Sequence, residues 1–251
     1  MKREMEPYQL IERSIIKKYR KELWTPFIVA VKRYELIKAG DKIAVCISGG
    51  KDSMLMAKLM QELQRHSDVP FELVFLVMDP GYNEINRQKI ESNAELLHIP
   101  VTIFESNIFS VANNTDKNPC YLCARMRRGH LYSKAKELGC NKLALGHHKD
   151  DAVETFIMNL FDQGRIGCFS PVSYLSRKDL TVIRPLILAE EKEVKQAVRR
   201  ENFPIIKSSC PVDGHTEREW AKQWVREMEH QKRDIKSQIF GAMRRAHISD
   251  W

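Results

Sequence analysis

Short apolar runs alternate with longer amphipathic segments between residues 41 and 205. The apolar runs are rich in β-branched residues and predict buried strands; the amphipathic segments repeat their apolar residues every three or four positions and predict helices. The predicted strands are residues 43–47, 71–78, 101–104, 142–145 and 182–183. The predicted helices are residues 52–65, 84–98, 120–138 and 190–200, and one whose apolar face carries Val153, Phe156, Ile157 and Leu160. Residues 113–118 and 170–180 are predicted to be loops.

Strands and helices that alternate with short connections imply an α/β fold with a doubly wound parallel sheet. Ligands of such sheets bind at the carboxyl ends of the strands, near the switch point of the strand order. We therefore expect residues 48–53, the turn at 78–81 and the turn at Gly146 to line one crevice.

The two ends of the chain are predicted to be helical. Residues 1–40 carry Lys17, Lys18, Arg20, Lys21, Lys32 and Arg33 among apolar residues such as Ile15, Trp24 and Phe27. This pattern suits a basic arm that presents lysines outward, and equally a plain amphipathic packing helix. One long helix is predicted over residues 216–245. The expected domains are a basic helical region at 1–40, the α/β domain at 41–205 and a helical region at 206–251.

The composition is that of an ordinary globular chain, with 43% hydrophobic and 29% charged residues among 251. No stretch has the apolar length that spans a bilayer, and residues 1–7 lack the apolar run of a signal peptide, so we expect a cytoplasmic protein with reduced cysteines. The net charge of +8 suits a polyanionic partner such as RNA, although a solvated basic surface accounts for it equally well.

The most informative stretch is Ser-Gly-Gly-Lys-Asp-Ser at residues 48–53, between the first predicted strand and its helix. Adjacent glycines permit positive φ angles and close approach of backbone N–H groups to a ligand, and the helix N-terminus favours phosphate. Lys51 adds a mobile cation, and Asp52 and Ser53 can cap the helix or hold a metal ion. The spacing is neither that of a Walker A loop nor that of a dinucleotide fold. It resembles the pyrophosphate loop of the ATP pyrophosphatases, which cleave ATP between its α and β phosphates.

A second candidate site is the Cys-x-x-Cys pair Cys120 and Cys123, which is followed by Arg125, Arg127 and Arg128. Two thiolates at this spacing suit a structural zinc, a redox dithiol or an iron–sulfur cluster. A second regularly spaced pair for zinc is missing from the sequence. Cys210 lies far along the chain, and three thiolates would leave one iron of a 4Fe-4S cluster open to an external ligand. The arginines suit phosphates of ATP or RNA.

A third candidate site follows the predicted strand 142–145, where Gly146 precedes His147, His148, Asp150 and Asp151. A glycine at a strand end permits close backbone approach. We favour helix capping and nucleotide positioning over a metal cluster here, because a carboxylate is favourable in the first turn of a helix. The remaining cysteines, Cys46, Cys140 and Cys168, are expected to act as small hydrophobic residues.

Five motifs occur in order: SGGKDS at 48–53, CYLCARMRRG at 120–129, LGHHKDD at 145–151, IRPL at 183–186 and FPII at 203–206. Together they resemble the tRNA 2-thiocytidine synthetase family (TtcA), iron–sulfur-dependent tRNA thiolation enzymes with a PP-loop ATP pyrophosphatase fold. The resemblance covers nearly the whole chain, from about residue 9 to residue 247.

The resemblance implies that a tRNA pyrimidine is adenylated at its 2-oxo group by ATP and Mg²⁺, after which sulfur replaces the activated oxygen. It implies catalytic roles for Asp52, Arg127 and Asp151, and a 4Fe-4S cluster bound by Cys120, Cys123 and Cys210. The residues expected to bind ATP are Cys46, Ile47, Ser48, Gly49, Gly50, Lys51, Asp52, Ser53, Met78 and Gly146. A sulfur donor (sulfide or a persulfide carrier such as a cysteine desulfurase) and a homodimer are implied as partners, with no membrane.

This sequence departs from the family in one respect. The best-known members carry a second Cys-x-x-Cys near the third ligand, whereas here Cys210 stands alone before Pro211. That leaves open thiolation of another base, such as 2-thiouridine, although the terminal cysteine pairs of the uridine-modifying enzymes are missing from the sequence. Two further alternatives are a lysidine-synthetase-like adenylating enzyme, which does not need the cysteine pair, and a non-catalytic RNA-binding iron–sulfur sensor.

Overall fold

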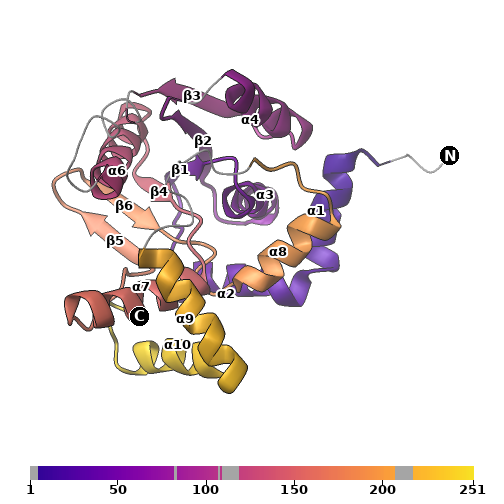
Figure 1. The fold of residues 1–251 in the computed structure, drawn as a ribbon. Helices are drawn as coiled ribbons and strands as arrows, with labels where there is room; N and C mark the ends of the chain where they lie inside the picture. Colours follow the sequence, from indigo (N-terminus) through magenta and orange to yellow (C-terminus); the bar gives the residue numbers. More distant parts are fainter. Residues whose placement is uncertain (1–4, 82–83, 107, 109–118, 207–216) are drawn as a thin grey trace.

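The computed structural model describes residues 5–81, 84–106, 108, 119–206 and 217–251, with the backbone alone at 119–121. A six-stranded sheet lies at its centre (Figure 1). The strands are β1 (Lys42–Ile47), β2 (Glu72–Asp79), β3 (Val101–Glu105), β4 (Lys142–Ala144), β5 (Val172–Leu175) and β6 (Leu180–Ile183). The helices of the α/β region are α3 (Lys51–His66), α4 (Glu84–Leu96), α6 (Pro119–Glu137), α7 (Lys149–Gln163) and α8 (Glu191–Arg200).

The strand order is β3-β2-β1-β4-β6-β5, and each pair is parallel except β5 with β6. The order reverses direction on either side of β1, so the switch point of this sheet lies between β1 and β4. The expected α/β fold with a largely parallel sheet and short crossovers is thereby confirmed. Because the parallel strands all end on the same edge, this edge collects the loops that follow β1, β2, β4 and β6.

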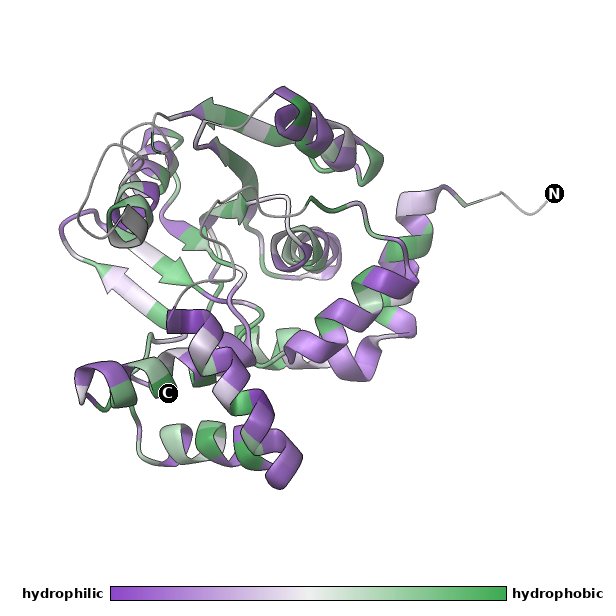
Figure 2. Cartoon of the chain, in the orientation of Figure 1, coloured by the Kyte–Doolittle hydropathy of each residue, from purple (hydrophilic) through white to green (hydrophobic). Residues whose placement is uncertain are grey.

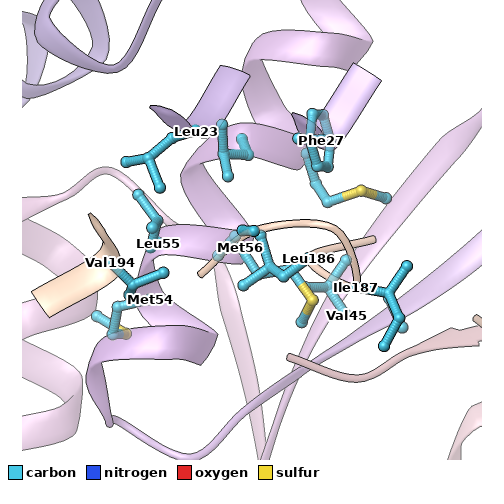
Figure 3. Packing of buried hydrophobic residues seen from close by; sticks show 14 of the residues in the cluster. Leu23, Phe27, Val45, Met54, Leu55, Met56, Leu186, Ile187 and Val194 are labelled. Atoms are coloured by element: carbon cyan, nitrogen blue, oxygen red, sulfur yellow. The ribbon is translucent and has the colours of Figure 1, made fainter. Parts of the chain in front are cut away.

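The two faces of the sheet are covered unequally. On one face α6 packs over a small cluster that includes Ala44, Leu76 and Leu143. On the other face α3 lies in a large core that receives residues from the N-terminal helices and α8 (Figure 3). Met54 and Met56 of α3 are fully buried there. Figure 2 shows hydrophobic colours along β2, whose last five residues are all buried.

The N-terminal region folds into α1 (Pro7–Lys17), a π-helical turn (Arg20–Trp24) and α2 (Thr25–Arg33). Ile15, Leu23 and Phe27 are fully buried. The six basic residues singled out from the sequence are all exposed. Both interpretations of this segment therefore hold, because it packs on the core and presents its lysines outward. Lys18 also pairs with Glu201 beyond the end of α8 at 2.6 Å, and Figure 1 shows α1 and α8 side by side.

Two predictions of local structure were wrong. Residues 170–180 are not a loop throughout, because β5 lies within them as a short edge strand that gains its hydrogen bonds from β6. The long helix predicted for 216–245 is two helices, α9 (Glu217–Gln231) and α10 (Ile235–Arg245). The chain reverses between them so that both can contact α7. Leu160 is 39% exposed, at the end of the otherwise buried face of α7.

The described residues contain no helix long and apolar enough to cross a membrane. The predicted loop at 113–118 lies outside the described residues, and so does Cys210.

Candidate active site

The glycine loop, residues 48–53, connects the end of β1 to the start of α3. Gly49 has a φ of +78°, a conformation that side chains rarely adopt. The Ser53 hydroxyl accepts from the Ser48 backbone N–H at 3.2 Å and donates to the Gly50 carbonyl at 3.0 Å, so it closes the turn. Gly50 precedes the first residue of α3, and the helix start has no side-chain cap. The suggestion that Asp52 or Ser53 caps the helix is therefore wrong.

Lys51 does not extend into open space. Its Nζ lies 2.7 Å from Asp52 Oδ2 and 3.2 Å from Glu191 Oε1 of α8. Burial lowers the pKa of Lys51, but Asp52 and Glu191 outweigh it and raise the pKa above its usual value. The lysine is therefore a fixed, paired cation that joins the loop to α8.

A cavity of about 690 Å³ opens beside the loop at the carboxyl edge of the sheet. It is lined by residues from the ends of β1, β2, β4 and β6 and from α6, α7 and α9. Among them are Cys46, Ile47, Ser48, Asp52, Ser53, Met78, Arg127, Arg128, Gly146, His147, Asp151, Phe169, Arg184 and Arg218. The expected crevice at the strand ends is thus present. Gly49, Gly50 and Lys51 support it from behind and are not among its lining residues.

Gly146 shows why the turn after β4 needs a glycine. A Cβ atom at this position would lie 3.4 Å from the Asp52 carbonyl carbon and from the Ser53 nitrogen. The turn after β4 therefore packs directly against the glycine loop. This contact joins two motifs that lie almost 100 residues apart in the sequence.

The acidic and histidine residues after Gly146 cap α7. The His148 side chain accepts from the Asp151 N–H at 3.3 Å, and Asp151 Oδ2 accepts from the His148 N–H at 2.8 Å. Asp151 Oδ1 also accepts from Arg218 of α9 at 3.2 Å. Burial raises the pKa of Asp151, but His148, His147 and Arg218 hold it below its usual value. The expected capping role is therefore confirmed, with His148 as the N-cap residue and Asp151 completing the capping box from the first turn.

Asp52 is the acidic side chain of the glycine loop itself. Its Oδ2 pairs with Lys51, whereas its Oδ1 is buried, lacks a hydrogen-bond partner and lies 3.7 Å from His148 Nε2. A carboxylate oxygen left open beside a phosphate-binding loop fits Mg²⁺, which takes one or two carboxylates and completes its shell with phosphates and water.

The Cys-x-x-Cys pair lies at the start of α6, where residues three apart fall on the same helix face. Cys123 is half-buried and directly precedes Ala124, which lines the cavity. The side chain of Cys120 and all of Cys210 lie outside what the structure describes. Thiolates are the ligands that iron–sulfur clusters use, so the described part of this donor set fits such a group.

Cys46, Cys140 and Cys168 are free thiols. Burial raises the pKa of all three, and that of Cys168 to about 12. They are therefore protonated and not nucleophilic, in agreement with the expectation that they act as hydrophobic residues.

His147, after β4, was singled out from the sequence, whereas Arg184, after β6, was not. His147 Nδ1 and Arg184 Nε are both buried without a hydrogen-bond partner, and both residues contact the Phe169 ring. Burial lowers the pKa of His147 to about 4, with Arg184 among the minor causes. Arg184 was quoted within the motif at 183–186 but received no role. Its place directly after a strand was the signal, because residues at the carboxyl edge of a parallel sheet face the ligand.

Comparison with known proteins agrees with this geometry. The sequence model of the family described as a PP-loop domain matches residues 16–228. The fold, the glycine loop and the cavity therefore define a protein of the PP-loop class.

Curated relatives narrow the class. A tRNA-cytidine(32) 2-sulfurtransferase of Geobacter sulfurreducens is 37% identical over 85% of this chain and 85% of the relative. One of Ralstonia pickettii is 35% identical over 88% of this chain and 72% of the relative. The chain belongs to this family of tRNA sulfurtransferases.

A solved structure has the same fold. It is the U34-tRNA thiolase NcsA from Methanococcus maripaludis with its 4Fe-4S cluster, at a TM-score of 0.71 and 23% identity. The match covers 88% of this chain and 77% of that protein.

Proposed function

We propose that the protein uses ATP to adenylate the 2-oxo group of a cytidine in the anticodon loop of tRNA and then replaces that oxygen with sulfur, giving 2-thiocytidine. Family membership supports the reaction class. The observation that carries the proposal is one cavity onto which the glycine loop, Asp52 and the helix with the Cys-x-x-Cys pair all open. A site for activation and a site for sulfur delivery must share a space, because the first acts on the 2-oxo oxygen and the second on the carbon that bears it.

ATP binds with its β and γ phosphates on the N–H groups of residues 48–53, next to the start of α3. Asp52 Oδ1 would hold Mg²⁺, which would offset phosphate charge. The 2-oxo oxygen attacks the α-phosphorus, the bond to pyrophosphate breaks, and the leaving charge remains on the loop. Arg127 lies in the cavity wall, where a guanidinium stabilises phosphate charge as it develops.

Asp151 acts as a carboxylate, because its pKa is lowered and it is ionised at neutral pH. It accepts from Arg218 and caps α7, so it orients the wall of the cavity that faces the target base. An ionised carboxylate in this place can accept a proton but cannot donate one.

Three thiolates, Cys120, Cys123 and Cys210, would hold a 4Fe-4S cluster. Such a cluster supplies an iron without a protein ligand, which can carry the sulfur. The sulfur comes from sulfide or from a persulfide carrier such as a cysteine desulfurase, the latter together with two electrons from a thiol reductant. A bond forms between this sulfur and C2 of the adenylated base, the bond from C2 to the activated oxygen breaks, and AMP leaves with that oxygen. The exposed lysines and arginines of the two helical ends bind the tRNA phosphates, and the protein acts in the cytoplasm as a homodimer.

The test is a nucleoside assay under anaerobic conditions. Protein reconstituted with iron and sulfide is incubated with ATP, Mg²⁺, sulfide and bulk tRNA, and the nucleosides are analysed by mass spectrometry. We expect 2-thiocytidine in the presence of ATP, and none without ATP or with Cys123→Ser protein. A different thiolated nucleoside would overturn the cytidine assignment, and no thiolation by cluster-loaded protein would overturn the function.

A further inference from the structure

Arg184 is a buried cation without a counterion. It follows β6, is 8% exposed and lines the 690 Å³ cavity. Its Nη1 donates to the Ser170 carbonyl and to Ser173 Oγ, and its guanidinium lies 4.7 Å from the centre of the Phe169 ring. Its Nε has no hydrogen-bond partner, and within the described residues no carboxylate lies within ion-pairing distance. Such a charge is costly to bury unless something compensates it.

Two other cations of this region are compensated. Lys51 pairs with Asp52 and Glu191, and Arg218 pairs with Asp151. Each of them therefore has a carboxylate of the protein as its partner. Arg184 has neutral oxygens and an aromatic ring instead. Burial lowers its pKa to about 10, so the guanidinium is still charged at neutral pH.

The guanidinium is also held in place. Phe169, on which it stacks, contacts the Trp251 ring at 6.5 Å between centroids. The next residue back, Cys168, donates its N–H to Ser249 Oγ at 3.0 Å. The C-terminal residues therefore support the segment that carries Phe169. A cation fixed in this way provides a preorganised partner for an anion.

We propose that Arg184 binds the α-phosphate of the nucleotide, through its unpartnered Nε and its charge. This assignment rests on the proposed ATP-dependent function, and it names the residue that holds the phosphorus at which the reaction takes place. The glycine loop after β1 takes the pyrophosphate part of ATP. The strand order β1-β4-β6 places Arg184 two strands away, roughly 10 Å at the usual strand spacing. The α-phosphate lies on this side of the loop, towards the target base.

A phosphate of the tRNA backbone fits Arg184 less well. The polynucleotide chain remains at the mouth of the cavity, where exposed side chains such as Arg128 meet it. A side chain that is 8% exposed reaches a group that has entered the cavity. The α-phosphate enters, because it must stand between the loop and the base.

Ligand binding tests the assignment without tRNA. Binding of AMP, adenosine and pyrophosphate to the full chain is measured by calorimetry for wild type, Arg184→Met, Arg184→Lys and the control Arg177→Met. Arg177 is exposed between β5 and β6. A charged hydrogen bond contributes a factor of about 10 to 100 in affinity, so Arg184→Met should weaken AMP by that factor. Adenosine and pyrophosphate should bind to Arg184→Met as they bind to wild type. Arg184→Lys should lose less AMP affinity than Arg184→Met, and Arg177→Met should lose none.

Three results for Arg184→Met would overturn the assignment. They are an equal loss of affinity for AMP and adenosine, a loss of affinity for pyrophosphate instead of AMP, and an unchanged affinity for AMP. A loss of tRNA binding with AMP unchanged would assign Arg184 to the RNA backbone. If Arg184→Met does not fold, Arg184→Lys decides by the same comparison of AMP with adenosine. AMP binding needs no tRNA and no cluster, so it can be measured even if the protein does not thiolate tRNA. A failure of the proposed function and a failure of the Arg184 assignment can therefore be told apart.

Discussion

The two sides of the cavity differ in how their polar groups are satisfied. On the loop side, Lys51 pairs with both Asp52 and Glu191, and Ser53 closes the turn from within, although Asp52 Oδ1 has no hydrogen-bond partner. On the far side, at the ends of β4 and β6, His147 and Arg184 each keep a buried nitrogen without a partner. The loop side is built by its own contacts. The far side is incomplete within the described residues and is suited to a ligand that supplies the missing bonds.

This difference assigns separate tasks to the two sides. A side whose groups are fixed before binding suits the pyrophosphate part of ATP, because that group has the same structure in every turnover. Unpartnered donors and acceptors suit the part of the reaction that changes, the α-phosphate and the base. Substitutions on the loop side should therefore affect folding or ATP use broadly, whereas those on the far side should act selectively.

Asp52→Asn should have the largest effect, because it removes the charge of the one open carboxylate oxygen on the loop side while it preserves the side-chain size. We expect ATP-dependent thiolation to fall by about 100- to 1,000-fold, the usual loss when a group that stabilises transition-state charge is removed. Single-turnover thiolation assays on bulk tRNA measure this loss of activity. Asp179→Asn, at an exposed ion pair with Lys136, is the matched control and should retain full activity. Retention of a tenth of the activity in Asp52→Asn would contradict the metal-holding role.

Gly49→Ala should be the most destabilising loop substitution. The residue has a φ of +78°, and the added Cβ would lie 2.6 Å from Cγ1 of Ile206 and 3.1 Å from that of Ile90. The backbone strain and the overpacking together should cost about 2 to 4 kcal/mol of unfolding free energy, measured with urea. Gly50→Ala is the control, because its Cβ would meet nothing closer than 3.5 Å and its φ is negative. Equal costs at the two positions would show that the turn adapts.

The loop side could be predicted from the sequence because its information is local. Residues 48–53 occupy one turn, and two glycines between a strand and a helix indicate a tight turn by themselves, as the positive φ of Gly49 shows. The pairing of Lys51 with Glu191 was not foreseen, since it joins residues 140 positions apart. Lys51 was therefore expected to be mobile, and the structure shows it paired.

The far side could not be predicted, because it depends on which strands are neighbours. The strand order places β6 beside β4, and only this order brings Arg184 close to His147. β5 was missed for a related reason: a four-residue edge strand is stabilised by its pairing with β6, and its own sequence is too short to show a period. The break between α9 and α10 lacks a glycine or proline signal and follows from packing on α7.

Glu191→Gln tests whether the loop side is held by its own pairs. Glu191 Oε1 contacts Lys51 and Lys222, and Oε2 contacts Lys195 at 2.8 Å. The three lysines outweigh the burial of Glu191 and hold its pKa well below its usual range. The substitution removes the carboxylate charge that Lys51, Lys195 and Lys222 share, while Lys51 keeps its contact with Asp52. It should cost about 1 to 2 kcal/mol in urea unfolding at pH 7, less than for a fully buried pair. Glu193→Gln on the same helix should cost less than about 0.5 kcal/mol. Equal losses of unfolding free energy in Glu191→Gln and Glu193→Gln would mean that the ion pairs of Glu191 add little to stability.

His147→Gln should have the smallest effect, and it concerns the far side. Because burial lowers the pKa of His147 to about 4 from 6.5, the unfolded chain binds a proton between these values that the folded protein does not. This group therefore makes the free energy of unfolding fall as the pH drops from 6.5 towards 4. In the variant, the loss between pH 7 and pH 5 should be smaller than in wild type by about 1 kcal/mol.

The measurement is urea unfolding at both pH values, with His230→Gln as the control because His230 is exposed on α9. A variant that loses as much stability as wild type would show that His147 takes up a proton in the folded state. The charge of Asp151 would then stabilise the protonated imidazole, and the far side would not keep a neutral nitrogen for its ligand. Addition of AMP sharpens the comparison, because an anion beside Arg184 favours a protonated neighbour and should raise the pKa of His147.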